Sequence, residues 1–144
     1  MFEEYGIGFH IAQWNVSFNK TQGTLRGMHY QLPPYEEIKL VQCVRGAVVD
    51  VVIDLRPDSP TFCQWISANL MPENQSQMFV PPGCAHGYLT LDDNVEVMYL
   101  VSEFYHPECA RGVRWDDPRF QIDWPIQDNL IINDRDAKYP DFEC

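Results

Sequence analysis

The hydrophobic residues of this chain fall in short runs that are rich in valine and aromatic residues and are broken by Pro, Gly and Asp at frequent intervals. Runs of this kind are typical of β-strands joined by turns. We expect strands at 40–44, 47–55, 62–70, 77–80, 87–91 and 95–102. Helical periodicity is almost absent, so the pattern favours a sandwich or a barrel over alternating βαβ units.

The runs on either side of Arg45-Gly46 form the clearest candidate for a hairpin. The second run, 47–55, is apolar on both faces for most of its length, which predicts a central strand. After Ser102 the chain is rich in turn-forming residues, yet it keeps aromatic side chains that need a surface to bury against. These are Phe104, Tyr105, Trp115, Phe120 and Trp124. We therefore expect this tail to wrap around the sheets.

Length, charge and cysteine content narrow the class of protein. The 144 residues fit a single domain, 1–144. A formal net charge of -11 argues against a nucleic-acid binder, which needs a basic surface to displace counterions from phosphates. Five cysteines without a CxxC pair argue against a disulfide framework or a zinc site. The first five residues lack a signal-peptide pattern, and no run is long enough to span a membrane, so we expect a soluble, cytoplasmic protein.

Two of the four histidines stand in short segments dense in glycine and proline. His86 ends a Pro-x-Gly-x-x-His turn at 81–86, which resembles the second signature of the cupin superfamily, barrels that often hold a metal ion. His29 lies in 25–31, which reads LRGMHYQ. A metal cupin has a His-x-His pair at the corresponding place, and here the second histidine is Gln31. Because a transition metal would have few nitrogen ligands, we expect no bound metal.

Several segments in order resemble one family. They are 25–31, Lys39, 59–62, 82–89, 115–118 and 122–125. Together they are similar to the dTDP-4-dehydrorhamnose 3,5-epimerase family, metal-independent cupins of sugar-nucleotide metabolism, over about Gln13 to Asp136. The resemblance implies an all-β cupin-type double-stranded β-helix, a jelly-roll barrel, with a loop-rich C-terminal wrap. It also implies a nucleotide-sugar substrate, no cofactor and a homodimer.

The resemblance assigns four catalytic residues, and the chemistry of epimerisation explains them. A base must remove a proton next to a ketone while a donor stabilises the enolate oxygen, and these roles fall to His29 and Lys39. Asp136 would orient His29 and support its imidazolium form. Inversion requires an acid on the opposite face, which would be Tyr99; strand alternation places it on one face with its valine neighbours at 97 and 101.

Further residues match ligand-binding positions of the family. They are Gln13, Asn15, Arg26, His86, Tyr105 and Arg135. Arg26 offers a planar fork suited to phosphate oxygens. Tyr105 matches a tyrosine that stacks on the nucleotide base, and His86 would line the same pocket as His29.

We therefore expect an epimerase that acts on dTDP-4-dehydro-6-deoxyglucose at C3 and C5. Three alternatives remain open: a non-catalytic cupin that binds sugar nucleotides, a 3-epimerase or isomerase of a related dTDP sugar, and a metal-dependent cupin oxygenase or isomerase. At the residue level, His29 and Tyr99 could be hydrogen-bonded core residues, and Asp136 could be a solvated carboxylate.

Overall fold

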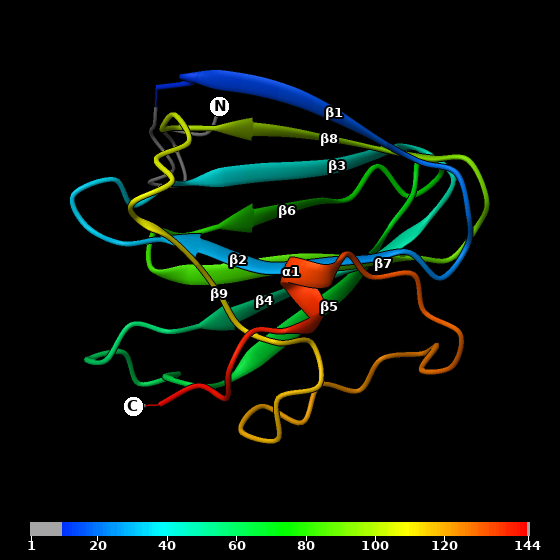
Figure 1. The fold of residues 1–144 in the computed structure, drawn as a ribbon. Coiled ribbons are helices and arrows are strands. Elements are labelled where there is room, and N and C mark those ends of the chain that lie inside the picture. The colour runs from blue at the N-terminus through cyan, green and yellow to red at the C-terminus, as the bar shows by residue number, and fades with distance from the viewer. Residues whose placement is uncertain (1–9, 144) are drawn as a thin grey trace.

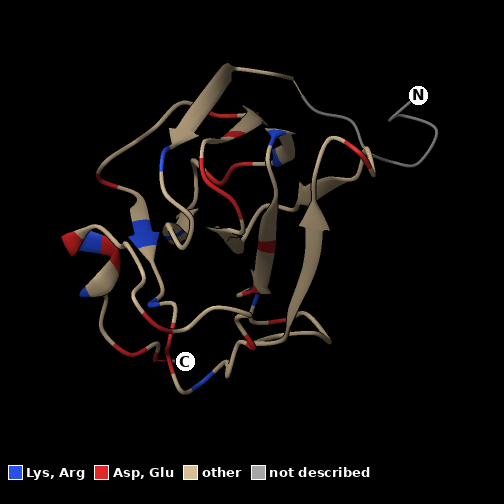
Figure 2. Cartoon of the chain, turned by 90° about the vertical axis from the view of Figure 1, so that its right-hand side faces the viewer, with Lys and Arg blue, Asp and Glu red and all other residues tan. Residues whose placement is uncertain are grey.

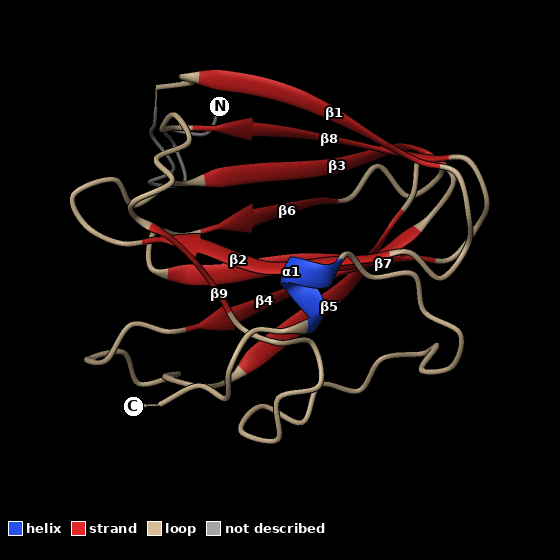
Figure 3. Cartoon of the chain, in the orientation of Figure 1, coloured by secondary structure: helices blue, strands red, loops and turns tan. Residues whose placement is uncertain are grey.

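Two antiparallel β-sheets packed face to face make up the computed structural model, which describes residues 10–143 (Figures 1 and 3). The first sheet contains, in spatial order, β1 (Gln13–Asn19), β8 (Val95–Val101), β3 (Lys39–Arg45) and β6 (Gln77–Val80). The second contains β5 (Trp65–Leu70), β4 (Val48–Asp54), β7 (Cys84–Thr90), β2 (Leu25–Gln31) and β9 (Ala110–Gly112). The helix within residues 10–143 is the short α1 (Asp134–Ala137). This arrangement confirms the predicted all-β, cupin-like architecture.

The predicted hairpin around Arg45-Gly46 is wrong. Both runs are strands, but β3 pairs with β6 and β8, whereas β4 pairs with β5 and β7. Gly46, with a φ of 79°, turns the chain from one sheet into the other. All seven residues of β4 are buried, as expected for a central strand, and its partners lie far away along the chain. A local hydrophobic pattern indicates burial without indicating which strand pairs with which.

Two hydrophobic clusters hold the sheets in place. One fills the interior at one end of the barrel and includes Val41, Val52 and Val97. The other lies on the outer face of the second sheet, where the C-terminal tail covers it with Phe120 and Trp124, 5% and 3% exposed (Figure 1). The predicted wrap is therefore confirmed. The prediction drawn from the first five residues lies outside the described range, in which no helix is long and apolar enough to cross a membrane.

Candidate active site

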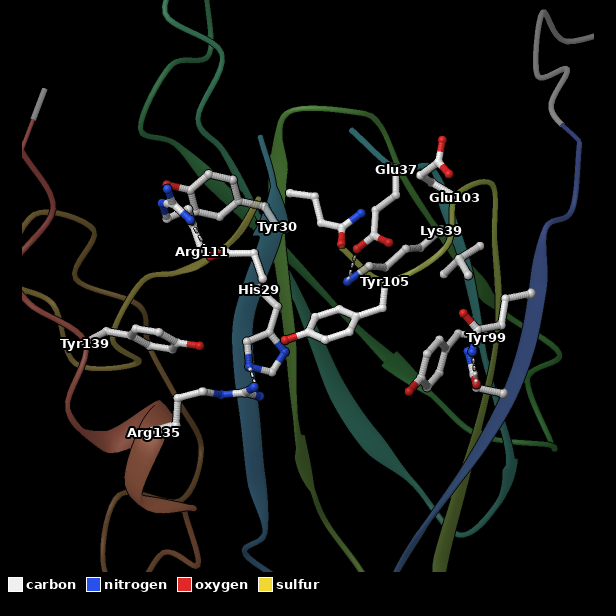
Figure 4. A pocket seen from close by; sticks show the side chains of 15 residues that line it. His29, Tyr30, Glu37, Lys39, Tyr99, Glu103, Tyr105, Arg111, Arg135 and Tyr139 are labelled. Atoms are coloured by element: carbon white, nitrogen blue, oxygen red, sulfur yellow. Dashed lines mark hydrogen bonds and ion pairs between the residues drawn. The ribbon is translucent and has the colours of Figure 1, made fainter. Parts of the chain in front are cut away.

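Two adjoining pockets, of about 260 and 250 Å³, open between the sheets at the end of the barrel that the apolar cluster leaves unfilled. Both are lined by His29, Lys39, Tyr99 and Arg135. His29 comes from β2 in the second sheet, whereas Lys39 and Tyr99 come from β3 and β8 in the first (Figure 4). The base and the acid expected from the sequence therefore stand on opposite walls.

His29 is hydrogen-bonded to a fully buried aspartate. Its Nε2 lies 2.7 Å from Asp136 Oδ1. Asp136 Oδ2 accepts hydrogen bonds from the Gly27 N–H and from Asn133 Nδ2, both at 3.1 Å. Asn133 also caps α1, because its Oδ1 accepts from the Asp136 N–H at 2.8 Å. The start of α1 thus holds the Asp136 carboxylate next to the His29 imidazole, and both carboxylate oxygens accept hydrogen bonds.

The hydrogen bond from Gly27 to Asp136 depends on a close approach of β2 and β7 at Gly27 and Gly87. The pairing of β2 with β7 is irregular between Arg26 and His29, and Gly27 adopts a φ of 119°. A Cβ at Gly27 would lie 2.6 Å from the Gly87 Cα, so a larger residue does not fit. Glycine at both positions lets β2 bend toward α1, and the Gly27 N–H then reaches Asp136.

The protonation states suit proton transfer at neutral pH. Burial lowers the pKa of His29 below 6.5 and outweighs the hydrogen bond and charge of Asp136, which raise it. Burial alone would raise the pKa of Asp136, but the hydrogen bond from His29 brings it below its usual value. Asp136 is therefore ionised and accepts the Nε2 proton of a neutral His29. The other ring nitrogen points toward the pocket (Figure 4). Burial also raises the pKa of Tyr99 above 10.0, so its hydroxyl keeps its proton.

The lysine of the site is nearly buried. The side chain of Lys39 is 11% exposed, and its Nζ lies 3.2 Å from Glu37 Oε1 (Figure 4). It projects from the same face of β3 as the core residue Val41. An ammonium group in this place can donate to an oxygen held between the two walls.

The remaining predicted ligand residues line the same two pockets. They are Gln13, Asn15, Arg26, His86, Tyr105 and Arg135. Gln13 and Asn15 face inward on β1 and are joined by a hydrogen bond of 3.2 Å. The Nε of Arg26 donates to Asn19 Oδ1 at 2.7 Å. Tyr105 reaches the pocket from the loop after β8 and is 60% exposed.

The sequence reasoning missed a second histidine–aspartate pair. His86 Nε2 lies 2.7 Å from Asp50 Oδ1, and His86 stands directly opposite His29 in the β2–β7 register. Asp50 Oδ2 is buried and has no hydrogen-bond partner. The signal was present, since Asp50 is a charged residue with three apolar or small neighbours on each side, 47–49 and 51–53, in a run predicted to be a central strand.

Arg111 and Tyr139 also line the first pocket and were not predicted, since an arginine and a tyrosine in a turn-rich tail carry no local signal. Gln31, noted in the sequence only as the residue in place of a metal-binding histidine, lines the same pocket. Among residues 10–143, no three His, Cys, Asp or Glu side chains are grouped so that they could hold a metal ion.

Comparisons with known proteins agree on one family. The family model described as dTDP-4-dehydrorhamnose 3,5-epimerase matches residues 1–143. The enzyme of that name from Shigella flexneri is 47% identical over 94% of this chain and 75% of its own length. The crystal structure of the Bacillus anthracis enzyme, with TDP and PPi bound, superimposes with a TM-score of 0.95 at 41% identity, covering 98% of this chain and 80% of that one.

A further solved relative is a 3′-monoepimerase from Streptomyces bikiniensis, in complex with dTDP, with a TM-score of 0.87 and 34% identity over 97% of this chain and 70% of that one. It is a double mutant in which one histidine is replaced by asparagine and one tyrosine by phenylalanine. Those two residues are as far apart along its sequence as His29 and Tyr99 are here. By its sequence and its fold, the chain belongs to the dTDP-4-dehydrorhamnose 3,5-epimerase family.

Proposed function

We propose that the protein, as one domain over residues 1–144, epimerises dTDP-4-dehydro-6-deoxyglucose at C3 and C5 to give dTDP-4-dehydrorhamnose. The observation that carries this proposal is the His29–Asp136 pair, which faces Tyr99 across a pocket that also contains Lys39. A base, an opposing acid and a cationic donor around one cavity are the groups that epimerisation next to a ketone needs.

In the first step, the free Nδ1 of His29 removes the proton from the carbon beside the C4 ketone. The electron pair of the broken C–H bond forms the enolate, and the negative charge moves to the ketone oxygen. Lys39 donates a hydrogen bond to that oxygen. The ionised Asp136 stabilises the imidazolium that His29 becomes, as in other histidine–aspartate pairs.

In the second step, the Tyr99 hydroxyl delivers its proton to the opposite face of the same carbon, and the ketone re-forms. Tyr99 is then a phenolate, and it regains a proton from solvent while the His29 imidazolium gives its proton up. The protein returns to its starting state, no redox change takes place, and the configuration of one carbon is inverted. The same sequence at the other carbon beside the ketone completes the conversion.

The charge distribution supports a nucleotide diphosphate as the anchor of the substrate. Acidic positions are spread over the strands and loops of the molecule (Figure 2). Four of the ten Lys and Arg residues nevertheless line the two pockets: Arg26, Lys39, Arg111 and Arg135. Two carboxylates, Glu37 and Glu103, line the first pocket as well, so cations outnumber carboxylates there in a protein with a net charge of -11. This local excess of positive charge favours a phosphorylated ligand in that place. We assign Gln13, Asn15, Arg26, Arg135 and Tyr105 to the nucleotide diphosphate and His86 to the sugar.

Deuterium wash-in tests the function directly. The purified protein is incubated with dTDP-4-dehydro-6-deoxyglucose in D2O, and NMR reports deuterium at C3 and C5 separately. We expect exchange at both carbons, with loss of exchange in His29→Asn. Tyr99→Phe is the matched variant of the opposite wall and should block inversion.

Each alternative has its own outcome in this experiment. Exchange at C3 alone would identify a 3-epimerase, the activity named for the Streptomyces bikiniensis relative. Thermal stabilisation by dTDP without any exchange would identify a non-catalytic binding protein.

We also propose that the protein works as a homodimer in the cytoplasm. The outward side chains of β1, Trp14, Val16 and Phe18, are 65%, 56% and 52% exposed. An apolar strip of this kind on a sheet is typical of a surface that another protein covers. The described cysteines, Cys43, Cys63, Cys84 and Cys109, are all unpaired, which agrees with a reducing compartment.

A further inference from the structure

A tyrosine near the C-terminus occupies a space beside the catalytic histidine that a strand neighbour would normally fill. His29 on β2 is paired with Gly112 on β9, so a side chain at 112 would stand next to the imidazole. Gly112 has none, and a Cβ built there would overlap the ring of Tyr139. The Tyr139 ring therefore takes the place of the missing cross-strand neighbour of His29.

The ring of Tyr139 is oriented toward the His29–Asp136 pair. The centroids of the Tyr139 and His29 rings are 6.3 Å apart with an interplanar angle of 77°, an edge-to-face arrangement. The Tyr139 hydroxyl points to the side where His29 and Arg135 lie (Figure 4). Burial, the charge of Asp136 and a side-chain hydrogen bond with Asp136 raise the pKa of Tyr139, so its hydroxyl stays protonated at physiological pH.

The backbone of Tyr139 is held independently of the pocket. Arg114 Nη1 donates to the Tyr139 carbonyl oxygen at 3.1 Å, and Arg114 Nη2 donates to Asp141 Oδ1 at 2.7 Å. Arg114, in the segment after β9, thus holds the backbone of Tyr139. The Tyr139 side chain interacts with Asp136, whose carboxylate is 0% exposed although it belongs to a four-residue helix.

We propose that Tyr139 is a positioning residue for the base: its ring closes the outer side of the His29–Asp136 pair, excludes water from their hydrogen bond and holds the imidazole plane. The proposal rests on the function proposed above, in which His29 is the base. Tyr139 touches neither the ketone nor the diphosphate in this role. Tyr139 affects catalysis indirectly, because it limits the solvent exposure of His29 and fixes the orientation of the imidazole ring.

The other groups around His29 act on it by charge or as neighbouring ring or hydroxyl groups, and they come from every element that surrounds it. They are Asp136 and Arg135 of α1, Lys39 of β3, His86 of β7, Tyr99 of β8, Arg111 of β9, and Glu37, Glu103 and Tyr105 of the loops. Burial is the largest cause of the lowered pKa of His29, ahead of the charges. Loss of the Tyr139 ring would admit water and should move that pKa upward, toward 6.5.

An NMR titration of the His29 ring in the full-length protein tests this without substrate. In Tyr139→Ala we expect the pKa of His29 to rise toward 6.5, whereas Tyr139→Phe, which keeps the ring and removes only the hydroxyl beside Asp136, should give a much smaller change. With substrate, kcat of Tyr139→Ala should fall on the order of tenfold, far less than on removal of the base itself. The acid limb of its pH profile should move upward with the NMR pKa.

Gly112→Ala is a second variant that should remove the Tyr139 ring from its place beside His29. The new methyl group would displace the Tyr139 ring from beside His29, although Tyr139 itself is unchanged and Arg114 still holds its backbone. We expect the upward shift of His29 seen in Tyr139→Ala, with thermal unfolding used to check that both variants are folded. An unchanged His29 pKa in the two variants would overturn the proposal, and so would an equal shift in Tyr139→Phe. Since the titration needs no turnover, an inactive wild-type protein would refute the epimerase assignment and leave this test standing.

Discussion

At the scale of single residues, two histidines meet in the pocket and each uses one ring nitrogen for a buried aspartate. The pairs differ in their surroundings. Asp136 receives hydrogen bonds on both oxygens, from His29, Gly27 and Asn133. Asp50 Oδ2 has no hydrogen-bond partner. A carboxylate with three donors remains ionised, so His29 has a permanent counter-charge for its protonated form.

The directions of the pKa shifts predict a broad pH optimum. His29 must be neutral to accept a proton, so kcat/KM falls as pH drops through its pKa, which burial holds below 6.5. Tyr99 must be protonated to donate, so kcat/KM falls as pH rises through its pKa, which burial holds above 10.0. We expect a plateau between these limits in a pH profile of kcat/KM. An acid limb above 6.5 would contradict the environment described for His29.

Asp136→Asn should reduce both activity and stability. Asp136 Oδ2 accepts from two donors, the Gly27 N–H and Asn133 Nδ2, and Oδ1 accepts from His29. An asparagine must place its NH2 group at one of these two positions, so at least one donor would then face another donor. Leaving buried donors unpaired costs about 1–3 kcal/mol of unfolding free energy. Loss of the counter-charge should lower kcat by roughly a hundredfold or more.

Steady-state kinetics and thermal denaturation measure the two effects of Asp136→Asn. Asp134→Asn is the matched control, because it makes the same change on the exposed side of α1. Wild-type-like kcat in Asp136→Asn would remove Asp136 from the mechanism.

At the scale of elements, the predictability of each strand depends on what it faces. β4 is buried throughout and was predicted from its apolar run, whereas β1 was not predicted. In β1 the polar side chains Gln13 and Asn15 face inward because this end of the barrel is a pocket, and Trp14 faces outward. The usual rule that apolar residues point inward is therefore reversed at the site itself. Matching family motifs located Gln13 and Asn15, and hydrophobic patterning alone would have misassigned them.

The end of β2 connects two loops that border the pocket. The Gln31 side chain is buried; its Nε2 donates to the carbonyl oxygens of Tyr35 and Phe104, at 2.8 and 3.3 Å. Its Oε1 accepts from the His106 N–H at 2.7 Å, and the ring of His106 stacks on Tyr35 at 3.5 Å. The bonds to Phe104 and His106 hold the backbone on either side of Tyr105. Gln31 therefore fixes the loop that carries the residue assigned to the nucleotide base.

Gln31→Leu should weaken substrate binding more than turnover. The substitution keeps a side chain of similar size but removes all three hydrogen bonds, so the loop with Tyr105 loses its anchor. We expect KM to rise roughly tenfold, equivalent to about 1.4 kcal/mol, with a smaller change in kcat. Tyr105→Ala should give the same separation of KM from kcat. A fall in kcat with unchanged KM would place Gln31 in the proton-transfer step instead.

At the scale of the whole molecule, the two sheets have different outer faces. The C-terminal tail covers the second sheet with Phe120 and Trp124. The outer face of the first sheet has no such cover in the described chain, and its register aligns Trp14, Leu100, Leu40 and Phe79 in one row. Charge, length and composition, which indicated one acidic globular domain, carry no information on this difference. It depends on where the tail runs, which only the three-dimensional structure gives.

The uncovered outer face of the first sheet, with β1 at its edge, predicts where the proposed dimer forms. A second copy of the chain would bury Trp14, Val16 and Phe18, and a charge among them would have to be desolvated on association. Trp14→Glu should therefore raise the dimer dissociation constant by at least tenfold, measured by light scattering or analytical ultracentrifugation over a concentration series. Ile66→Glu is the matched control, because Ile66 is 61% exposed on β5 at the edge of the other sheet. Equal weakening by both substitutions would indicate a different interface, and a monomeric wild type would exclude the dimer. Since His29 and Tyr99 belong to one chain, a folded Trp14→Glu monomer should keep measurable deuterium exchange.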